Sequence, residues 1–150
     1  MDMKTVLCAG ILLVAVLICG CTTSSQESTV AGDIQTPNLI GDWTGTMNGY
    51  VDGIGYTDYS GYTLTLRITE QKDRIFSGEI TFSEQSGWES VACAGAIGRD
   101  GRTITMVESG GSDGDGGYSS GYLTGPDEME LIYAVVSDPI SITIDVLKKS

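Results

Sequence analysis

Apolar and polar residues alternate in short segments along most of the chain after about residue 40. In one such segment Leu64, Leu66 and Ile68 alternate with polar residues, which is the period-two pattern of a strand with one buried face. No segment in this region has the apolar spacing of an amphipathic helix. The pattern predicts eight strands, at about 41–50, 61–70, 75–83, 88–97, 102–108, 117–124, 128–137 and 140–147.

The predicted strands are joined by two kinds of connection. Those at 71–74, 98–101 and 125–127 are tight, whereas those at 51–60 and 109–116 are longer and rich in Gly, Asp and Ser. Short sequential connections favour an up-and-down antiparallel sheet, and eight such strands can close into a barrel without exposed edges. The predicted fold is therefore an all-β, roughly eight-stranded antiparallel up-and-down barrel. A β-sandwich is the alternative.

The two long connections are expected to lie at the same end of this barrel. Connections alternate between the two ends of an up-and-down barrel, so the tight hairpins and both ends of the domain belong to the other end. Loops on a rigid scaffold are where binding residues usually lie. We therefore expect recognition at the rim that carries the long loops.

That rim is rich in aromatic and acidic residues. Aromatic faces beside carboxylates suit polar ligands with apolar faces, such as sugars, because one surface offers both stacking and hydrogen bonding. The alternative is structural, with the rings packed on glycine-rich backbone to hold the loops to the barrel. The candidate ligand rim comprises Tyr56, Asp58, Tyr59, Trp88, Asp113, Asp115 and Tyr118.

The interior is expected to be filled by apolar side chains of the strands, because a barrel this small usually leaves little cleft. In the last strand, Ile144 is expected to face inward and Asp145 to alternate with it. A carrier of an apolar ligand inside the barrel is the alternative, which would require an apolar cavity. The expected filling side chains are Leu64, Ile80, Met106, Leu131 and Ile144.

The residue types argue against the common catalytic and metal chemistries. The chain contains no histidine, which excludes Ser-His-Asp and Cys-His catalysis and the commonest zinc ligand. Cys93 lies among small strand residues and is expected to be a buried hydrophobe. Counting Asp113 as position one of a calcium loop, the sixth residue is Tyr118 where an EF-hand requires glycine. The sequence predicts no enzyme, no metal site and no cofactor.

The first twenty-one residues have the pattern of an export signal. Lys4 precedes an uncharged apolar run at 6–18, which is too short to span a bilayer comfortably and is followed by Gly20 and Cys21. The segment 17–21, Leu-Ile-Cys-Gly-Cys, resembles the lipobox of prokaryotic lipoproteins. This resemblance implies that Cys21 is lipidated and becomes the new N-terminus. A small Ala, Ser or Thr is more usual where Cys19 stands.

The export pattern divides the chain into three parts. Residues 1–20 are interpreted as a helical lipoprotein signal peptide, residues 21–38 as the lipidated cysteine and a disordered, flexible tether, and residues 39–150 as the barrel domain. The expected location is the cell membrane, with a lipid anchor holding the domain at the cell exterior or in the periplasm.

A second resemblance concerns the first strand of the domain. Gly41-Asp42-Trp43 resembles the Gly-x-Trp opening of lipocalin-like and avidin-like barrels. The arginine that commonly packs on that tryptophan in lipocalins is missing, and Lys148 and Lys149 occupy this tail. The resemblance implies a barrel and names no ligand.

Charge narrows the range of partners. The formal net charge is −12, so nucleic acid and anionic lipid headgroups are repelled and no nucleic-acid partner is expected. The predicted function is a membrane-anchored extracytoplasmic lipoprotein that binds a carbohydrate, peptide or small molecule at its rim. The alternatives are a structural or envelope-interaction lipoprotein without such a ligand, and the interior carrier.

Overall fold

The computed structural model describes residues 35–84, 87–110, 116–135 and 138–150, with the backbone alone at 84 and 87–89. The signal peptide, Cys21 and nearly all of the expected tether lie outside these residues. The described residues form strands and turns without a helix, and none of them forms a helix able to cross a membrane. The strands are β1 Gly41–Val51, β2 Gly55–Asp58, β3 Thr63–Lys72, β4 Ile75–Glu84, β5 Gly87–Ile97, β6 Thr103–Glu108, β7 Gly117–Gly125, β8 Glu128–Val135 and β9 Ser141–Lys149.

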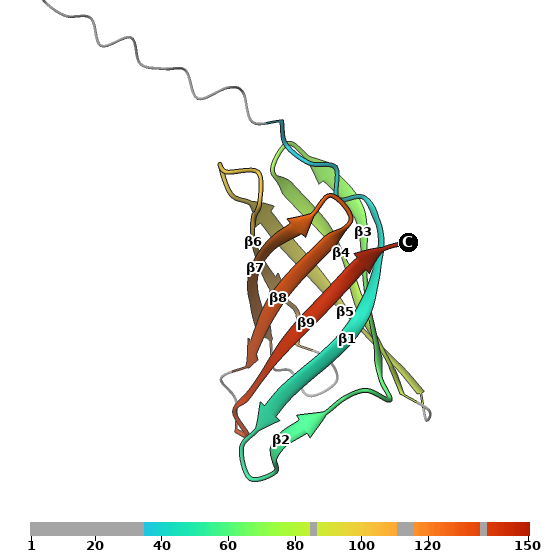
Figure 1. Cartoon of the computed structure of the whole chain (residues 1–150), viewed down its shortest axis with the longest axis vertical. Helices are drawn as coiled ribbons and strands as arrows, with labels where there is room; N and C mark the ends of the chain where they lie inside the picture. Colours follow the sequence, from blue (N-terminus) through green and yellow to red (C-terminus); the bar gives the residue numbers. More distant parts are fainter. Residues whose placement is uncertain (1–34, 85–86, 111–115, 136–137) are drawn as a thin grey trace, which may run out of the picture. The chain divides into compact units, whose positions relative to one another are not determined.

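Eight of these strands close into an antiparallel barrel (Figure 1). Each strand pairs with the next along the chain from β3 to β9, and β1 closes the ring by pairing with β9 from Trp43↔Lys149 to Val51↔Ser141. The all-β up-and-down barrel predicted from the alternation pattern is therefore confirmed, and the sandwich alternative is not.

The strand β2 was not predicted, because its four residues lie inside the segment interpreted as a long loop. It pairs with the last part of β1, at Asn48–Val51, on the same edge that β3 occupies at Gly41–Gly45. The first long connection thus extends the wall of the barrel at the end where β1 finishes (Figure 1).

The two ends of the barrel differ as the connections predict. The hairpins β3–β4, β5–β6 and β7–β8 lie at one end, here called the tight end, together with Leu39 and the C-terminus (Figure 1). The strands β1, β4, β6 and β8 finish at the opposite end, here called the wide end. Most of the large, fully buried side chains lie in the tight half, among them Leu39, Trp43, Ile68, Phe76, Ile97, Ile104 and Met129.

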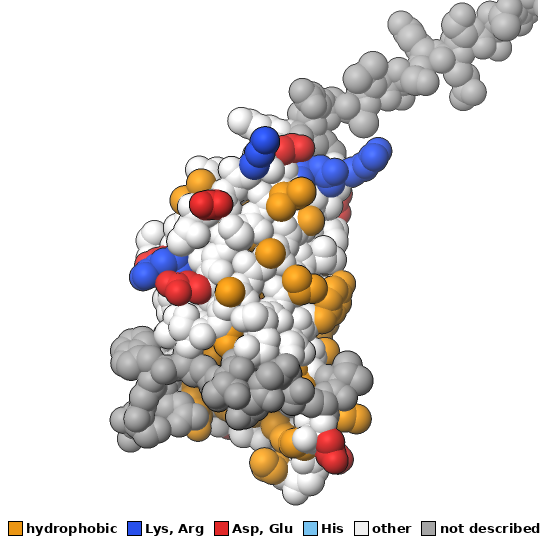
Figure 2. Space-filling model, turned by 180° about the vertical axis from the view of Figure 1, so that it is seen from behind, with side chains coloured by type: hydrophobic (Ala, Val, Ile, Leu, Met, Phe, Trp, Pro, Cys, Tyr) orange, Lys and Arg blue, Asp and Glu red, His pale blue; other side chains and the backbone are white. Residues whose placement is uncertain are grey.

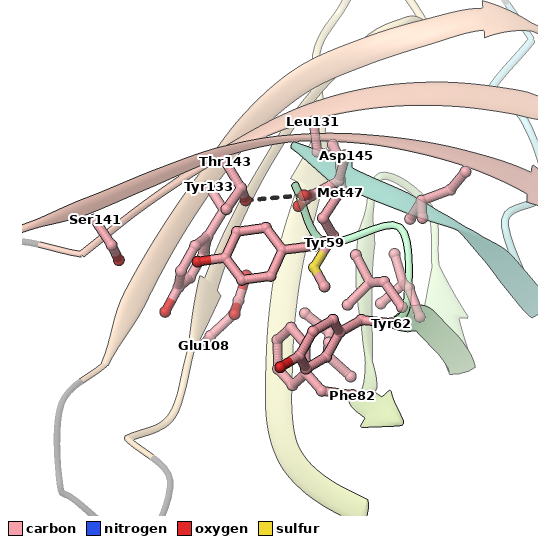
Figure 3. Close-up of a pocket in the computed structure, with 14 residues that line it drawn as sticks. Met47, Tyr59, Tyr62, Phe82, Glu108, Leu131, Tyr133, Ser141, Thr143 and Asp145 are labelled. Carbon is pink, nitrogen blue, oxygen red and sulfur yellow. Dashed lines mark hydrogen bonds between the residues drawn. The ribbon is translucent and has the colours of Figure 1, made fainter. Parts of the chain in front are cut away.

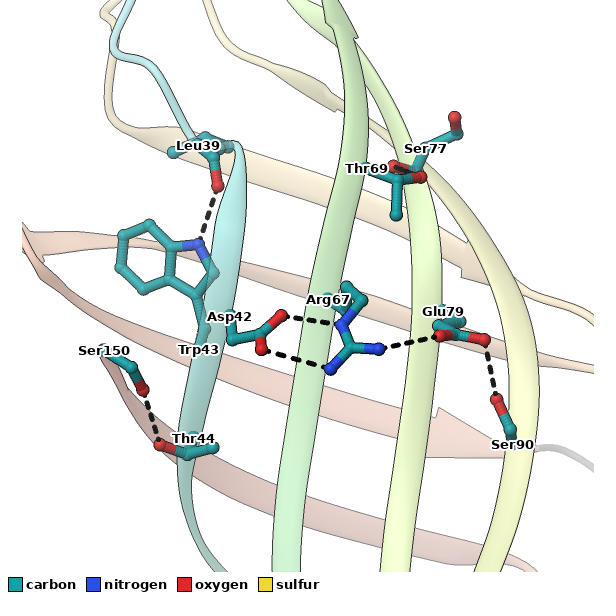
Figure 4. Close-up of polar contacts among 10 residues, drawn as sticks. All are labelled: Leu39, Asp42, Trp43, Thr44, Arg67, Thr69, Ser77, Glu79, Ser90 and Ser150. Carbon is teal, nitrogen blue, oxygen red and sulfur yellow. Dashed lines mark hydrogen bonds and ion pairs between the residues drawn. The ribbon is translucent and has the colours of Figure 1, made fainter.

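The outer face of β1, β3 and β4 is polar and carries a small network of charges (Figure 4). The Arg67 guanidinium donates to both carboxylate oxygens of Asp42, at 2.8 and 3.2 Å, and lies 3.6 Å from Glu79. The hydrogen bond from Arg67 lowers the pKa of Asp42 from its usual value. Because these side chains are exposed to water, the network orders the surface more than it stabilises the fold.

The last strand, β9, turns the opposite set of side chains toward the interior from the set that was expected. Ile144 is 49% exposed on the outer face, whereas Asp145 is 4% exposed and faces inward. The reason is the register with β8, in which the buried Leu131 lies opposite Asp145. Directly paired residues of antiparallel strands share a face, so the neighbouring pair Ile132↔Ile144 must point outward.

Candidate functional site

The wide half of the barrel contains a cavity of about 240 Å³. The sequence predicted a filled interior, and this prediction is wrong for the wide half, since Ile144 does not enter it. The tight half is filled, because Trp43 and its apolar neighbours are completely buried there. The cavity is lined by Met47, Tyr59, Tyr62, Leu64, Leu66, Ile80, Phe82, Glu108, Leu131, Tyr133, Ser141, Thr143, Asp145 and Leu147 (Figure 3).

Three tyrosines line the cavity, and two of them belong to the connection between β2 and β3. The rings of Tyr59 and Tyr62 meet edge to face, with centroids 5.5 Å apart and an interplanar angle of 79°. The Tyr62 amide donates to the Tyr59 carbonyl at 2.8 Å, and the Ser60 amide donates to the Asp58 carboxylate at 2.9 Å. These two bonds fold the connection into a tight turn that directs both rings toward the barrel interior.

A glycine makes room for the third tyrosine, Tyr133. A Cβ atom built on Gly117 would lie 2.0 Å from Cε2 of the Tyr133 ring, which is closer than any side chain can approach. Gly117 is the first residue of β7, and β8 carries Tyr133 beside it. The glycine therefore lets the Tyr133 ring lie across the neighbouring strand at the wide end.

Two carboxylates face the same cavity from different parts of the wall. Glu108 ends β6 and is 8% exposed, and Asp145 lies within β9 and is 4% exposed. The Ser119 hydroxyl donates to Glu108 at 2.7 Å. The Thr143 hydroxyl donates to Asp145 at 2.8 Å (Figure 3). Each buried acid thus receives a hydrogen bond from a neutral hydroxyl group.

Burial changes the acidity of both groups. It raises the pKa of Glu108 to about 7; the Ser119 hydrogen bond opposes this shift and the negative charge of Asp145 adds to it. Burial likewise raises the pKa of Asp145 to about 6, against the hydrogen bond from Thr143. Removing a carboxylate from water disfavours its charged form, which accounts for both directions. Near neutral pH the cavity therefore gains negative charge as the pH rises.

The described residues of the predicted rim are divided between the cavity and the outer surface, where Tyr56 and Asp58 line one shallow hollow with Tyr50 and Ile144. Tyr59 lines the cavity, whereas Tyr56 is 93% exposed and its ring meets that of Tyr50 with centroids 5.6 Å apart. Tyr118 is half exposed on β7, and Asp58 is exposed as the last residue of β2. The side chain of Trp88 and the residues Asp113 and Asp115 lie outside the described residues.

The cavity also contains polar residues that the sequence analysis missed. Glu108 could have been found from the sequence. Every second residue of β6 faces inward, and Glu108 follows Ile104 and Met106 in this series. Asp145 could not have been found, since β9 has apolar residues on both faces and only the register with β8 decides between them. Tyr133 was not considered, because it precedes a short connection.

Cys93 is buried, as predicted, and burial raises the pKa of its thiol to about 12. A thiol in this state is a poor nucleophile, since the thiolate is the reactive form. Within the part of the chain that the structure describes, no group of three or more Cys, Asp and Glu residues is arranged to hold a metal ion.

Comparison with known proteins identifies the fold. No protein-family model and no curated protein matches the chain. A de novo designed fluorescence-activating β-barrel is similar in structure with a TM-score of 0.53 and 12% identity, covering 75% of this chain and 94% of that chain. EF1p2_mFAP2b bound to DFHBI is similar with a TM-score of 0.55 and 8% identity, over the same shares of 75% and 94%. At such identities the likeness concerns the fold alone.

Proposed function

We propose that this protein is a non-enzymatic, lipid-anchored extracytoplasmic lipoprotein that binds a small molecule inside the wide end of its barrel. The observation that carries the binding role is the cavity of about 240 Å³ lined by aromatic rings and two buried carboxylates. An engineered cavity of about 150 Å³ in another protein binds benzene. The space here suits a ligand with one or two rings.

The polarity of the lining favours a ligand over a simple defect in core packing. A void left by imperfect packing is lined by apolar groups and costs stability through lost contacts. Here Glu108 and Asp145 add the further cost of buried acids, which a purely structural barrel would avoid with apolar side chains. Concave sites with a few convergent polar groups and shifted acidities are typical of binding sites.

The comparison also supports a small-molecule ligand. EF1p2_mFAP2b is a barrel of this fold and has been solved bound to a ligand, DFHBI. The rim remains part of the proposal, because Tyr59 and Tyr62 belong to a wide-end connection and line the cavity. A carbohydrate or peptide held on the outer surface by Tyr56 and Tyr118 has less support, since these side chains lie on separate strands.

A cavity-blocking variant tests this function. Ser141 lines the cavity at the first residue of β9, and Ser141→Phe would place a ring inside it. The adjacent Ile140 is 58% exposed, so Ile140→Phe introduces the same side chain outside. A library of one- and two-ring compounds screened by thermal shift should give hits that Ser141→Phe loses and Ile140→Phe keeps. If no compound stabilises the protein, or if Ser141→Phe binds the hits unchanged, a barrel without a small-molecule ligand is the better description.

The lipid anchor is the part of the proposal that rests on sequence. The lipobox-like segment 17–21 and the polar residues that follow it support attachment through Cys21. Cys21→Ser should release the protein from the membrane fraction, whereas Cys19→Ser should leave it anchored. Intact mass should show a chain that begins at Cys21 and carries lipid. Membrane retention of Cys21→Ser would contradict the anchor and leave the cavity argument unaffected.

A further inference from the structure

We propose that the ligand of this cavity is an organic cation, an amine carried on a one- or two-ring apolar body. This inference rests on the proposed binding function and adds the chemical class of the ligand. Its basis is that Glu108 and Asp145 face one cavity, and that the described lining residues include no Lys or Arg to neutralise their charge.

The two acids lack a positive partner within the described structure. The ion pairs found there join Arg67 to Asp42 and Glu79, and Lys148 to Glu128, all on the outer surface. Glu108 and Asp145 instead receive hydrogen bonds from hydroxyl groups. A buried carboxylate without a counter-charge is costly, and a bound ammonium group would reduce this cost by supplying the missing positive charge.

The rest of the lining suits the remainder of such a ligand. Tyr59, Tyr62, Phe82 and Tyr133 offer aromatic faces, which attract cations through the negative charge above the ring plane. Leu64, Ile80 and Leu131 offer apolar contacts deeper in the barrel. A neutral ligand would use the apolar and aromatic contacts only, and an anion would be repelled by both carboxylates. The lining as a whole therefore selects for a molecule with an apolar body and a positive group.

The charge distribution of the chain favours the approach of cations to the wide end. The described residues that connect strands there, at 52–62, 109–110, 116 and 138–140, contain three aspartates and neither Lys nor Arg. The Lys and Arg side chains visible in Figure 2 lie in its upper half, which is the tight half of the barrel. This uneven distribution of charge creates a negative electrostatic potential at the wide end, which raises the local concentration of cations there. From residue 35 on, the bases are Arg67, Lys72, Arg74, Arg99, Arg102, Lys148 and Lys149, and all except Arg67 lie at or beside the tight end.

Three matched compounds test the inference. We would titrate the intact chain at pH 8 by calorimetry with 1-naphthylmethylamine, 1-naphthalenemethanol and 1-naphthoic acid, which share a two-ring body and differ in charge. The amine is expected to bind at least about tenfold more tightly than the alcohol, because charge-assisted hydrogen bonds are about twice as strong as neutral ones. The acid is expected not to bind. The double variant Glu108→Gln with Asp145→Asn should remove the preference for the amine and retain binding of the alcohol.

Matched controls separate the cavity from general charge effects. Glu70→Gln and Asp127→Asn make the same two chemical changes at exposed positions near the tight end and should leave the preference intact. Equal affinity of amine and alcohol, or a preference that survives the double cavity variant, would overturn the cation assignment while leaving a binding cavity. Absence of binding by all three compounds would count against both the cation assignment and the proposed function, and cavity binding of other library compounds would restore the function alone.

Discussion

The ammonium group of Lys149 lies 5.3 Å from the centroid of the Trp43 ring, which the barrel buries completely. Lys149 also donates to the Asn38 carbonyl at 2.9 Å, and the Trp43 indole N–H donates to the Leu39 carbonyl at 2.8 Å. The last strand thus holds the segment before β1 against the tryptophan. Lys149, near the C-terminus, is therefore the cation that packs on this tryptophan.

This contact predicts a specific effect on stability. Lys149→Ala should lower the free energy of unfolding by about 0.5–1 kcal/mol through loss of the cation–π contact. Lys149→Arg should retain most of it, since a guanidinium can lie over the same ring. Denaturant unfolding measures both variants.

Lys148 supplies the control for this pair. Its side chain is 74% exposed and pairs with Glu128 at 3.5 Å on the outer surface. Lys148→Ala should therefore change stability little. If Lys148→Ala and Lys149→Ala prove equally destabilising, the stacking on Trp43 has no special role.

The barrel could be predicted from the sequence because its strands have one dominant buried face. In β3, Leu64, Leu66 and Ile68 alone are apolar, and all three are buried as expected. Local alternation suffices in such a strand. The short β2 was missed because a four-residue strand between glycine-rich turns carries too little pattern to be recognised.

The site could be predicted only in part, because it depends on contacts between distant strands. One face of β9 carries a series of three apolar residues, Ile142, Ile144 and Val146. The opposite face also carries an apolar residue, Leu147. Pairing with Leu131 decides that Asp145 faces inward, and this pairing is not visible in the local sequence. Tyr59 was identified as a candidate, but its entry into the cavity depends on the turn that its carbonyl closes with the Tyr62 amide.

The buried acids predict that stability falls as the pH rises. The pKa of Asp145 increases from 3.8 to about 6 and that of Glu108 from 4.5 to about 7, so the folded chain binds protons more tightly than the unfolded chain. Well below their ordinary pKa values, both groups are protonated in the folded and in the unfolded chain, so their burial does not lower the free energy of unfolding. Between about pH 4 and pH 7 the free energy of unfolding should decrease by about 3 kcal/mol for each group.

Unfolding at several pH values between about 4.5 and 8 tests this prediction. The double variant Glu108→Gln with Asp145→Asn should flatten the curve and be more stable than the parent at pH 8. The pKa of Asp100 is lowered to about 2 by hydrogen bonds from Thr103 and from the Arg102 amide. Asp100 therefore makes the free energy of unfolding increase with pH. This increase is confined to pH values below about 4, outside the tested range. A parent protein that gains stability toward pH 8 would contradict the assignment.

Gly117 should be essential for the shape of the cavity. A methyl group at this position collides with the Tyr133 ring, at 2.0 Å from Cε2, so Gly117→Ala must displace the ring or the strand. We expect a loss of about 1–3 kcal/mol in the free energy of unfolding, as for other overpacked sites, together with weaker ligand binding. A Cβ built on Gly61, in the turn beside Tyr62, meets nothing within 4 Å, so Gly61→Ala should be close to neutral. Equal behaviour of the two variants would show that the ring does not need this space.

Binding of an amine should depend on pH in the direction opposite to the stability of the free protein. The ammonium group favours the ionised acids, so affinity should rise from pH 5 to pH 8 as Glu108 and Asp145 lose their protons. The other titratable groups facing the cavity are Tyr59, Tyr62 and Tyr133, with Cys93 beside Glu108 in the wall. Burial raises the pKa of Cys93 to about 12, so the thiol stays neutral in this range. Calorimetry with 1-naphthylmethylamine at pH 5, 6, 7 and 8 should show this rise, and 1-naphthalenemethanol should not. An amine affinity that stays constant across the range would mean that the ammonium group is bound away from the two acids.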